Sequence, residues 1–270
     1  MEDTLFDKKV SIITVTYNSA NALVEHWKDF TPTKNIEWIV VDNNSSDSSA
    51  DVAERLGARV LKLPDNVGFS TANNIGFKSS VGEFVIFVNP DVVVKVDDIP
   101  ALYNASFRYN SLVAPQLINP DGSLQPNGRG IPFLYSKILN RLAPTSISNI
   151  YHRYTTETSI VECEWITGAV VCGTRSHLSR LGPWDEEYFV YYEDSDLGLR
   201  NLANGSRNIV VGSARWIHSW ARETSQFNYR AWKLEIRSGL KFYRRYPNYL
   251  NLFSFLRVLY KYNHRKRVED

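Results

Sequence analysis

The feature that most constrains the fold is the alternation, over the first ninety residues, of short apolar segments with polar segments of helical length. The apolar segments are rich in β-branched residues, as buried strands are: "VSIITVTY" (Val10–Tyr17), "EWIVVD" (Glu37–Asp42), "RVLKL" (Arg59–Leu63) and "FVIFVN" (Phe84–Asn89). The intervening segments are Ala20–Phe30, Ser48–Leu56 and Phe69–Ser80. Strands that alternate with helices imply right-handed crossovers and a mainly parallel sheet, so the sequence predicts an α/β fold.

Polar groups stand at the end of three of these predicted strands. They are Thr16-Tyr17-Asn18, Asp42-Asn43-Asn44 and Asn89-Pro90-Asp91. Because ligands of open α/β sheets gather at the carboxyl ends of the strands, we expect the binding site at this edge.

The second half of the chain is less regular. Residues 119–160 are predicted to form long loops with a short helix at Phe133–Leu142. Beyond them the pattern predicts a strand in "VECEWITGAVVCGTR", helices from about Ser176 and Glu193, a strand in "RNIVVG" and a helix from about Asn228 to Tyr246. Gly205 is a plausible stop for the second of these helices. No repeat and no linker between domains is evident.

Composition excludes several classes of protein. A chain of 270 residues, 43% hydrophobic and 22% charged, can bury a large core, and a net charge of +2 gives no reason to expect nucleic acid as a partner. Two cysteines without C-x-x-C spacing indicate a reducing cytosol. We expect the acidic start "MEDTLFDKKVSIITVTYN" to be neither a signal peptide nor a membrane anchor, and no apolar run approaches the roughly 18 residues that span a bilayer.

Two segments could bind a nucleotide. Asp42 could accept the imide N–H of a uracil or thymine, although the pattern taken alone favours an Asx-type turn before a Ser-capped helix. In "DNVGFSTANNIGFKSS" (Asp65–Ser80), Asn66, Ala72 and Asn73 could face a ribose or diphosphate, because helix N-termini attract phosphate. The alternative there is a loop followed by a capped helix, and the segment matches no GxGxxG or Walker fingerprint.

Two further residues are candidate metal ligands. Asp91 follows a strand, and Mg²⁺ and Mn²⁺ need few protein carboxylates when phosphates supply the other oxygens. By itself Asp91 would more often be a turn residue. His218 in "WIHSWARETS" lies between aromatic residues, where a lone histidine is usually a satisfied core residue unless a metal is near.

The densest acidic cluster is "GPWDEEYFVYYEDSDLGLR" (Gly182–Arg200). On a helix Glu193 and Asp196 would share one face, with Asp194 about 100° away. Acids in a first turn also suit the helix dipole, which is the structural alternative for all three. The surrounding aromatic residues would raise the pKa of a carboxylate and favour a general base.

Taken together, these segments resemble the family 2 glycosyltransferases of the GT-A fold, in particular their rhamnosyltransferase-like branch. The matching motifs are "SIITVTYNS", "VVDNNSSDSS", "NVGFSTANNIG", "FVNPDV", "WITGAVVCGTR", "GPWDEEYFVYYEDSDLGLR" and His218, in the family's order from Val10 to about Ser225. The resemblance implies a Rossmann-like mixed, mainly parallel sheet flanked by helices over residues 1–240, with a donor half at about 8–118 and an acceptor half at about 119–240. A helical C-terminal extension would cover 241–270.

The resemblance also implies the reaction: a metal-dependent inverting transfer of a hexose, L-rhamnose from dTDP-L-rhamnose, to a hydroxyl of a bacterial surface glycan such as O-antigen, capsule or cell-wall polysaccharide. The divalent cation would be Mg²⁺ or Mn²⁺. A galactofuranosyl or other UDP-hexose transferase is the nearest alternative. A catalytically silent glycan-binding module is disfavoured because Asp42, Asp91 and Asp194 are present, and a nucleotidyltransferase because "SIITVTYNSANAL" lacks a basic Gly-rich signature.

Carried over residue by residue, the resemblance implies Asp194 as catalytic base and Asp91 and His218 as metal ligands. The implied nucleotide-binding residues are Thr16, Tyr17, Asn18, Asp42, Asn44, Asn66, Gly68, Phe69 and Asn73. The residues implied for the acceptor or donor sugar are Asn89, Trp165, Gly168, Trp184 and Glu193. The sequence departs from the family's Asp-any-Asp motif at Asn89, a form common in this branch, which predicts weak metal binding without the donor diphosphate.

The last thirty residues, 241–270, hold eight Lys/Arg, two acids and eight aromatic residues, a local net charge of +6. One interpretation is a helix that packs its aromatics on the domain and ends in a solvated basic tail. The other, which we prefer because the implied acceptors are often lipid-linked, is peripheral contact with anionic headgroups. We therefore expect a cytoplasmic protein at the inner face of the cell membrane.

Overall fold

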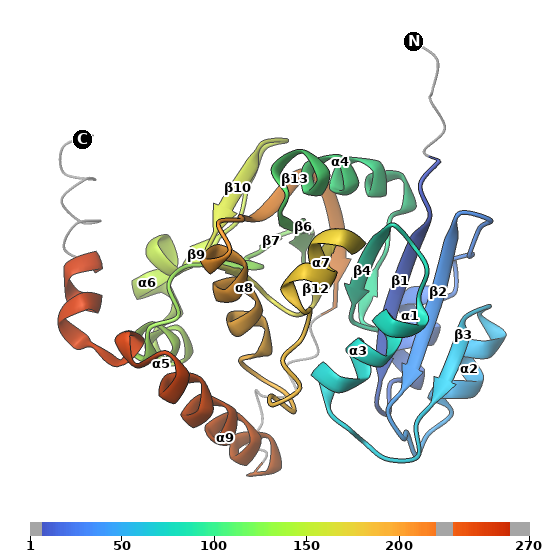
Figure 1. Cartoon of the computed structure of the whole chain (residues 1–270), viewed down its shortest axis with the longest axis horizontal. Helices are drawn as coiled ribbons and strands as arrows, with labels where there is room; N and C mark the ends of the chain where they lie inside the picture. The colour runs from blue at the N-terminus through green and yellow to red at the C-terminus, as the bar shows by residue number, and fades with distance from the viewer. Residues whose placement is uncertain (1–6, 220–228, 260–270) are drawn as a thin grey trace.

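The computed structural model describes residues 7–219 and 229–259, and within them a large mixed β-sheet forms the centre of the molecule (Figure 1). Its strands lie in the order β10-β13-β6-β12-β4-β1-β2-β3, with β5 paired to β13 and β7 to β6. Their bounds are β1 Val10–Thr16, β2 Ile36–Asp42, β3 Arg59–Lys62, β4 Phe84–Val88, β5 Val92–Val93, β6 Leu112–Ile118, β7 Leu124–Gln125, β10 Ile160–Cys163, β12 Val170–Thr174 and β13 Asn208–His218. A smaller sheet has the order β11-β8-β9, formed by Trp165–Ile166, Gly128–Arg129 and His152–Arg153.

Strands β3, β2, β1 and β4 are mutually parallel, as the alternating pattern predicts, and β6 runs parallel to β13. Strand β12 is antiparallel to β4 and β6 and joins these two parallel blocks. In the register between β1 and β2, Thr16 is opposite Asp42. The polar carboxyl ends of these two strands therefore lie side by side.

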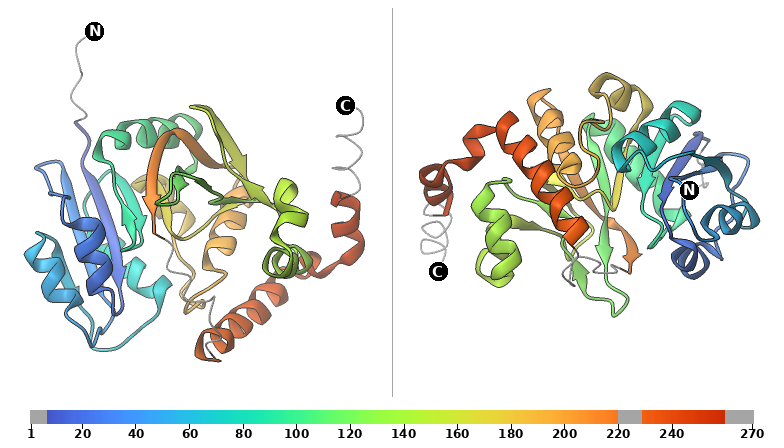
Figure 2. Two further views of the ribbon diagram at one scale, coloured as in Figure 1. Left: turned by 180° about the vertical axis from the view of Figure 1, so that it is seen from behind. Right: turned by 90° about the horizontal axis from the view of Figure 1, so that it is seen from below.

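Helices cover both faces of the sheet (Figures 1 and 2). Their bounds are α1 Ala20–Trp27, α2 Ser49–Arg55, α3 Phe69–Ser79, α4 Ile99–Tyr109, α5 Leu134–Leu142, α6 Pro144–Tyr151, α7 Arg175–Leu181, α8 Glu193–Ala203 and α9 Tyr229–Arg245, with 3₁₀ turns at Val96–Asp98 and Pro247–Leu250. Successive residues of a strand point to opposite faces. Ile12 accordingly packs in the cluster that includes α1, α2 and α4, and Ile13 in the cluster that includes α3, α7 and α8.

The α/β prediction is confirmed, and so are the four early strands with the three helices between them. The prediction of long loops at residues 119–160 is wrong, because this stretch also forms α6 and the strands β7, β8 and β9. Two-residue strands are too short to show an alternating pattern, so their pairing depends on neighbours that are distant in sequence. Helix α4 and strand β6 were not predicted from the sequence.

Helix α9 lies along one edge of the molecule beside α5 (Figures 1 and 2). Its Phe242 and Tyr243 are buried against Tyr192, which immediately precedes α8. The predicted boundary between residues 240 and 241 falls inside this helix. Among the described residues, no helix is both long and apolar enough to cross a membrane.

Candidate active site

The ends of β1 and β2 bring together the predicted base-binding pair. Thr16 Oγ1 donates to Asp42 Oδ1 at 3.0 Å, and the Ser45 N–H donates to Asp42 Oδ2 at 3.1 Å. Both Thr16 and Asp42 are buried. The fold thus holds a carboxylate in one orientation at the carboxyl edge of the sheet.

The other predicted residues of this edge are turn positions. Asn18 and Asn44 have φ values of +53° and +63°, a region that asparagine tolerates better than most residues. Asn18 Oδ1 accepts hydrogen bonds from the N–H and hydroxyl of Ser46, which ties the loop after β1 to the loop after β2. Tyr17 is exposed beside them.

The segment 66–73 makes its polar contacts within the protein. Asn66 Oδ1 accepts from the Gly68 N–H, and the Asn73 amide donates to the Phe69 carbonyl at 3.0 Å. Gly68 has φ +88°, and a Cβ there would lie 2.5 Å from the Phe189 carbonyl oxygen. The Phe69 N–H donates to the same oxygen at 2.6 Å. Only glycine therefore allows this loop to seat against the segment that leads into α8.

Asp91 and His218 face each other where β5 pairs with the end of β13. His218 Nε2 lies 3.3 Å from Asp91 Oδ1, a buried oxygen that accepts no hydrogen bond in the structure. His218 Nδ1 lies 2.5 Å from Gln125 Oε1, and Gln125 donates through its amide nitrogen to Asn119 Oδ1. Because that donation leaves Gln125 Oε1 facing the ring, Nδ1 carries a proton, and in a neutral ring Nε2 is the nitrogen that can bind a metal beside Asp91.

A carboxylate oxygen and the Nε2 of a neutral imidazole at this distance fit a bound cation. Neighbouring ligands of an octahedral ion with bonds of about 2.1 Å lie about 3.0 Å apart, close to the distance observed between Asp91 and His218. Among the described residues, no group of three or more His, Cys, Asp or Glu is placed to hold a metal. The pair therefore suits a Mg²⁺- or Mn²⁺-type ion that takes most of its ligands from phosphates and water.

Asp194 lies near the start of α8 and is held by backbone groups. Its Oδ1 accepts from the Ser195 N–H at 2.7 Å, and its Oδ2 accepts from the Gly168 N–H at 3.2 Å. Tyr191 and Tyr192 just before it have φ values of +68° and +70°, uncommon for bulky residues. This turn fixes the direction in which the first residues of α8 point.

Glu193 is buried beside Asp194. Its Oε2 has no hydrogen-bond partner, and a Cβ at Gly168 would lie 3.8 Å from its Oε1. Burial, reinforced by the charge of Asp194, raises the pKa of Glu193 to about 8. Burial therefore favours the protonated form of Glu193, which can donate a hydrogen bond.

Lys137 and Arg129 are basic residues of this site that the sequence did not indicate. Lys137 Nζ lies 3.8 Å from the Tyr192 ring centroid and 4.6 Å from that of Trp165, and it donates to Ser195 Oγ at 2.9 Å. Burial lowers the pKa of Lys137 to about 8 and also lowers the pKa of Arg129. The Nη1 of Arg129 is buried and has no hydrogen-bond partner. No motif marks either residue, because both lie in the stretch predicted as loops and one short helix.

The two tryptophans predicted for the acceptor site are buried. Trp165 donates through its ring nitrogen to the Gly130 carbonyl at 3.0 Å. Trp184 lies edge-on to Phe69 and Phe87, each with ring centroids 5.3 Å away. Trp184 is thus a core residue beneath the site, whereas Trp165 contributes one wall of the aromatic surroundings of Lys137.

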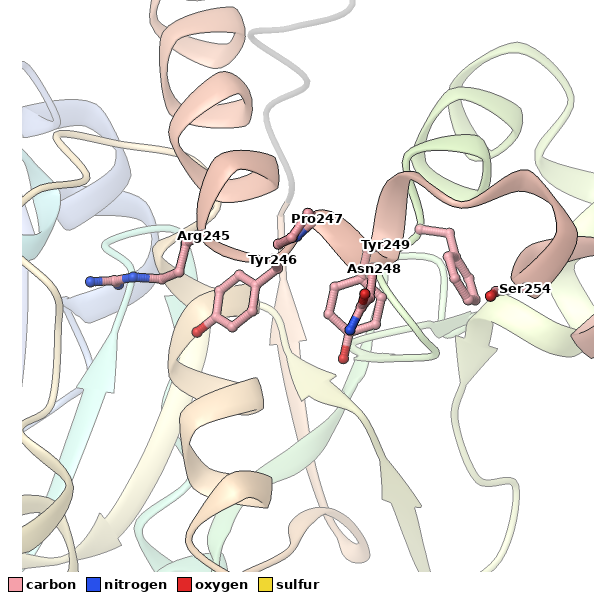
Figure 3. A pocket seen from close by; sticks show the side chains of 7 residues that line it. Arg245, Tyr246, Pro247, Asn248, Tyr249 and Ser254 are labelled. Carbon is pink, nitrogen blue, oxygen red and sulfur yellow. The ribbon is translucent and has the colours of Figure 1, made fainter.

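Asp196 differs from Glu193 and Asp194 because it is paired with two arginine side chains. It pairs with Arg200 at 2.7 Å and Arg245 at 2.9 Å, and it accepts from the Tyr246 hydroxyl at 2.8 Å. A pocket of about 400 Å³ lies alongside, lined by Phe133, Arg245, Tyr246, Pro247, Asn248, Tyr249 and Ser254 (Figure 3). This lining includes none of the predicted site residues, so the pocket is separate from the site that the sequence predicts.

The chain is similar in sequence and in fold to known proteins. The family model described as "Glycosyl transferase family 2" matches residues 11–165. The N-acetylglucosaminyl-diphospho-decaprenol L-rhamnosyltransferase of Mycobacterium tuberculosis is 30% identical over 208 residues, 70% of this chain and 68% of that protein. The rhamnosyltransferase WbbL of Escherichia coli is 25% identical over 188 residues, 66% of this chain and 70% of that protein.

Among solved structures, GalNAc-T7 with UDP, GalNAc and Mn²⁺ superposes with a TM-score of 0.59 at 18% identity, covering 80% of this chain and 44% of that one. This likeness concerns the fold alone. The matched family model and the identity with the mycobacterial enzyme show that the chain belongs to glycosyltransferase family 2, in its rhamnosyltransferase-like branch, and is a glycosyltransferase with the GT-A fold.

Proposed function

We propose that the protein transfers L-rhamnose from dTDP-L-rhamnose, with inversion and with a divalent cation, to a hydroxyl of a growing bacterial surface glycan. The rhamnose donor is supported by the two relatives named as rhamnosyltransferases. In this proposal residues 8–118 bind the donor and residues 119–240 the acceptor, which we propose to be lipid-linked. The C-terminal region from residue 241 is proposed to place the enzyme at the inner face of the membrane.

The observation that carries the proposal is the short connection between Asp91 and Asp194. Strands β4 and β12 pair with Val88 opposite Val170, and the Asn89 N–H donates to the Ala169 carbonyl at 2.9 Å. Asp91 follows Asn89 by two residues, and Gly168, whose N–H holds Asp194, precedes Ala169. The pairing of β4 with β12 therefore brings Asp91, which faces His218, close to Gly168, which orients the proposed base Asp194.

On the donor side, Asp42 would accept the imide N–H of thymine, with its orientation set by Thr16 and Ser45. Asp91 and His218 would hold the cation, which when bound neutralises the charge that develops on the leaving diphosphate. We propose that the Asn89 side chain, which follows the end of β4, hydrogen-bonds the donor sugar. We propose that Asn66, Gly68, Phe69 and Asn73 act mainly by shaping the loop under the diphosphate.

On the acceptor side, Asp194 would remove the proton of the attacking hydroxyl. Burial favours the protonated form of Glu193, which would donate a hydrogen bond and would be a poor second carboxylate nucleophile. One carboxylate acting as a base suits direct displacement, hence inversion, by the logic of inverting glycosidases. Lys137 would act as a positioning residue, because it donates to Ser195 Oγ and the Ser195 hydroxyl donates to Asp194 Oδ1.

The proposal is tested with a panel of nucleotide sugars assayed for hydrolysis and for thermal stabilisation, with and without Mn²⁺. We expect dTDP-L-rhamnose to give the largest response and Mn²⁺ to increase it. If a UDP-hexose works and dTDP-L-rhamnose does not, the donor assignment is wrong and the galactofuranosyl or UDP-hexose alternative replaces it. No turnover of any sugar nucleotide would contradict the proposal as a whole.

A further inference from the structure

Helix α9 has two faces of different character. Ser238, Gly239, Phe242 and Tyr243 are buried against the body of the molecule, where a Cβ at Gly239 would lie 3.2 Å from the Tyr192 hydroxyl. The residues exposed on the opposite side recur every three or four positions, as on one side of a helix. They are Tyr229, Lys233, Ile236, Arg237, Leu240 and Arg244.

This outward face, Tyr229 to Arg244, combines apolar and basic side chains without an acid. Its apolar members Tyr229, Ile236 and Leu240 are 72%, 56% and 71% exposed. Among the described residues, its basic members Lys233, Arg237 and Arg244 form no ion pair. Glu235, the one acid of α9, lies to the side and pairs with Arg141 at 2.8 Å.

The helical segment 252–259 continues this character along the same edge of the molecule, as Figures 1 and 2 show. Phe255 is buried and stacks against Tyr135, whereas Phe253 is 83% exposed and Leu252 and Leu256 are also exposed. A solvated helix gains nothing from leaving several large apolar side chains in water. Alternating Lys/Arg and large apolar residues on one face are typical of helices that lie in a membrane interface.

We propose that the outward face of α9, together with the exposed side of 252–259, docks on an anionic phospholipid surface. Its apolar side chains would enter the interface, and its Lys and Arg would meet lipid phosphates. Helix α9 is about 10 Å thick and its buried face contacts Tyr192, two residues before Asp194. Docking here therefore brings the bilayer surface within about one helix diameter of the start of α8.

The proposed membrane contact is thus centred on α9, and not on the C-terminal region from residue 241 named above. It rests on the proposed function only in naming a lipid-linked acceptor as the reason for docking. The binding test uses vesicles without acceptor or nucleotide sugar, so its failure leaves the transfer reaction untouched. Failure of the sugar-nucleotide assay likewise leaves the docking surface untouched.

The test is co-sedimentation of the full chain with phosphatidylcholine vesicles that contain about 30% phosphatidylglycerol, against pure phosphatidylcholine. We expect binding to the anionic vesicles only, weakening as salt rises. The variants I236S/L240S and K233E/R237E should each lower the bound fraction by about tenfold or more, since they remove interfacial apolar area and reverse attractive charges. All four side chains point outward, so the variants should unfold at the wild-type temperature.

Matched controls come from the donor half. V24S/V81S removes two apolar side chains that are 53% and 69% exposed, and K28E/K34E reverses two exposed lysines. Both should bind vesicles as the wild type does. The proposal is overturned if the wild type ignores anionic vesicles, or if the α9 variants bind like the controls. It is also overturned if the wild type is a dimer that I236S/L240S dissociates, because the face would then belong to a second copy.

Discussion

Lys137 and Tyr192 form a cation–π contact at the entrance to α8, with Nζ 3.8 Å from the ring centroid. Helix α5 supplies the cation, and the residue that turns the chain into α8 supplies the aromatic face. The ammonium also donates to Ser195, whose N–H holds Asp194. A positive charge is thus fixed beside the proposed base by residues that are distant in sequence.

Replacing Lys137 with methionine should lower kcat by about tenfold with little change in the KM for the donor, because positive charge is lost near Asp194 and not at the nucleotide. The melting temperature should not fall, since an apolar side chain suits aromatic surroundings and a desolvated cation is removed. Steady-state kinetics and thermal unfolding measure both effects. Exposed Lys34→Met is the control, and an unchanged kcat in Lys137→Met would remove Lys137 from the site.

Asp194→Asn should lower kcat by about 10² to 10⁴, the usual range for loss of a general base, while dTDP binding measured by calorimetry stays near wild type. The amide retains the shape of the carboxylate but cannot take the proton of a hydroxyl. Exposed Glu187→Gln provides a control on the same acidic segment. Full activity of Asp194→Asn would make the assignment of the base wrong.

The raised pKa of Glu193 predicts that the stability of the folded protein depends on pH. Its folded-state pKa of about 8 lies above the ordinary value of 4.5, so the folded protein holds the proton more tightly than the unfolded chain. The stabilisation that follows is complete below pH 4.5 and is lost as pH rises towards 8. In Glu193→Gln the fall in melting temperature across this window should therefore be shallower than in the wild type. Parallel profiles for the two proteins would contradict a protonated Glu193.

Gln125 should control metal binding through His218. Gln125→Leu removes the acceptor that holds His218 Nδ1–H, and loss of such an outer partner commonly costs about 10- to 100-fold in metal affinity. Free Mn²⁺ measured by electron paramagnetic resonance, in the presence of dTDP, gives the affinity without any assay of transfer. Asp91→Asn should weaken binding at least as much, and exposed Asp97→Asn should not. Equal Mn²⁺ affinity in all four proteins would exclude the site.

Asp42→Asn should weaken dTDP binding by about tenfold, because the amide oxygen is a poorer acceptor than a carboxylate for the imide N–H. Binding of inorganic diphosphate, which has no base, should be unchanged. Calorimetry with both ligands makes the comparison, with exposed Asp51→Asn as control. A parallel loss for dTDP and diphosphate would show that Asp42 supports the loop and does not read the base.

That Thr16 and Asp42 lie together could be predicted from the sequence for a physical reason. Strands β1 and β2 are parallel neighbours with the same carboxyl direction, so their local patterns alone bring Thr16 and Asp42 together. Lys137 and Gln125 could not be found in this way. Their positions depend on how α5 and β7 pack against α8 and β13, and neither has a motif of its own.

The acidic segment shows the same limit. Glu193, Asp194 and Asp196 are alike in sequence, and the helix dipole accounts for all three equally well. Only the packed structure separates them, because Arg245 and Tyr246 reach Asp196 from α9 and the residue that follows it, whereas Gly168 reaches Asp194 from the loop before β12.

The antiparallel pairing of β4 with β12 has a consequence for engineering. A chimera that exchanges nucleotide-sugar recognition with a relative at the predicted boundary between the two halves would be cut near residue 118. Strand β12 comes after that cut yet inserts between β4 and β6, which both come before it. A successful graft must therefore preserve the match of Val88 with Val170, because a slip of one residue would displace Gly168, and with it Asp194, relative to the incoming donor.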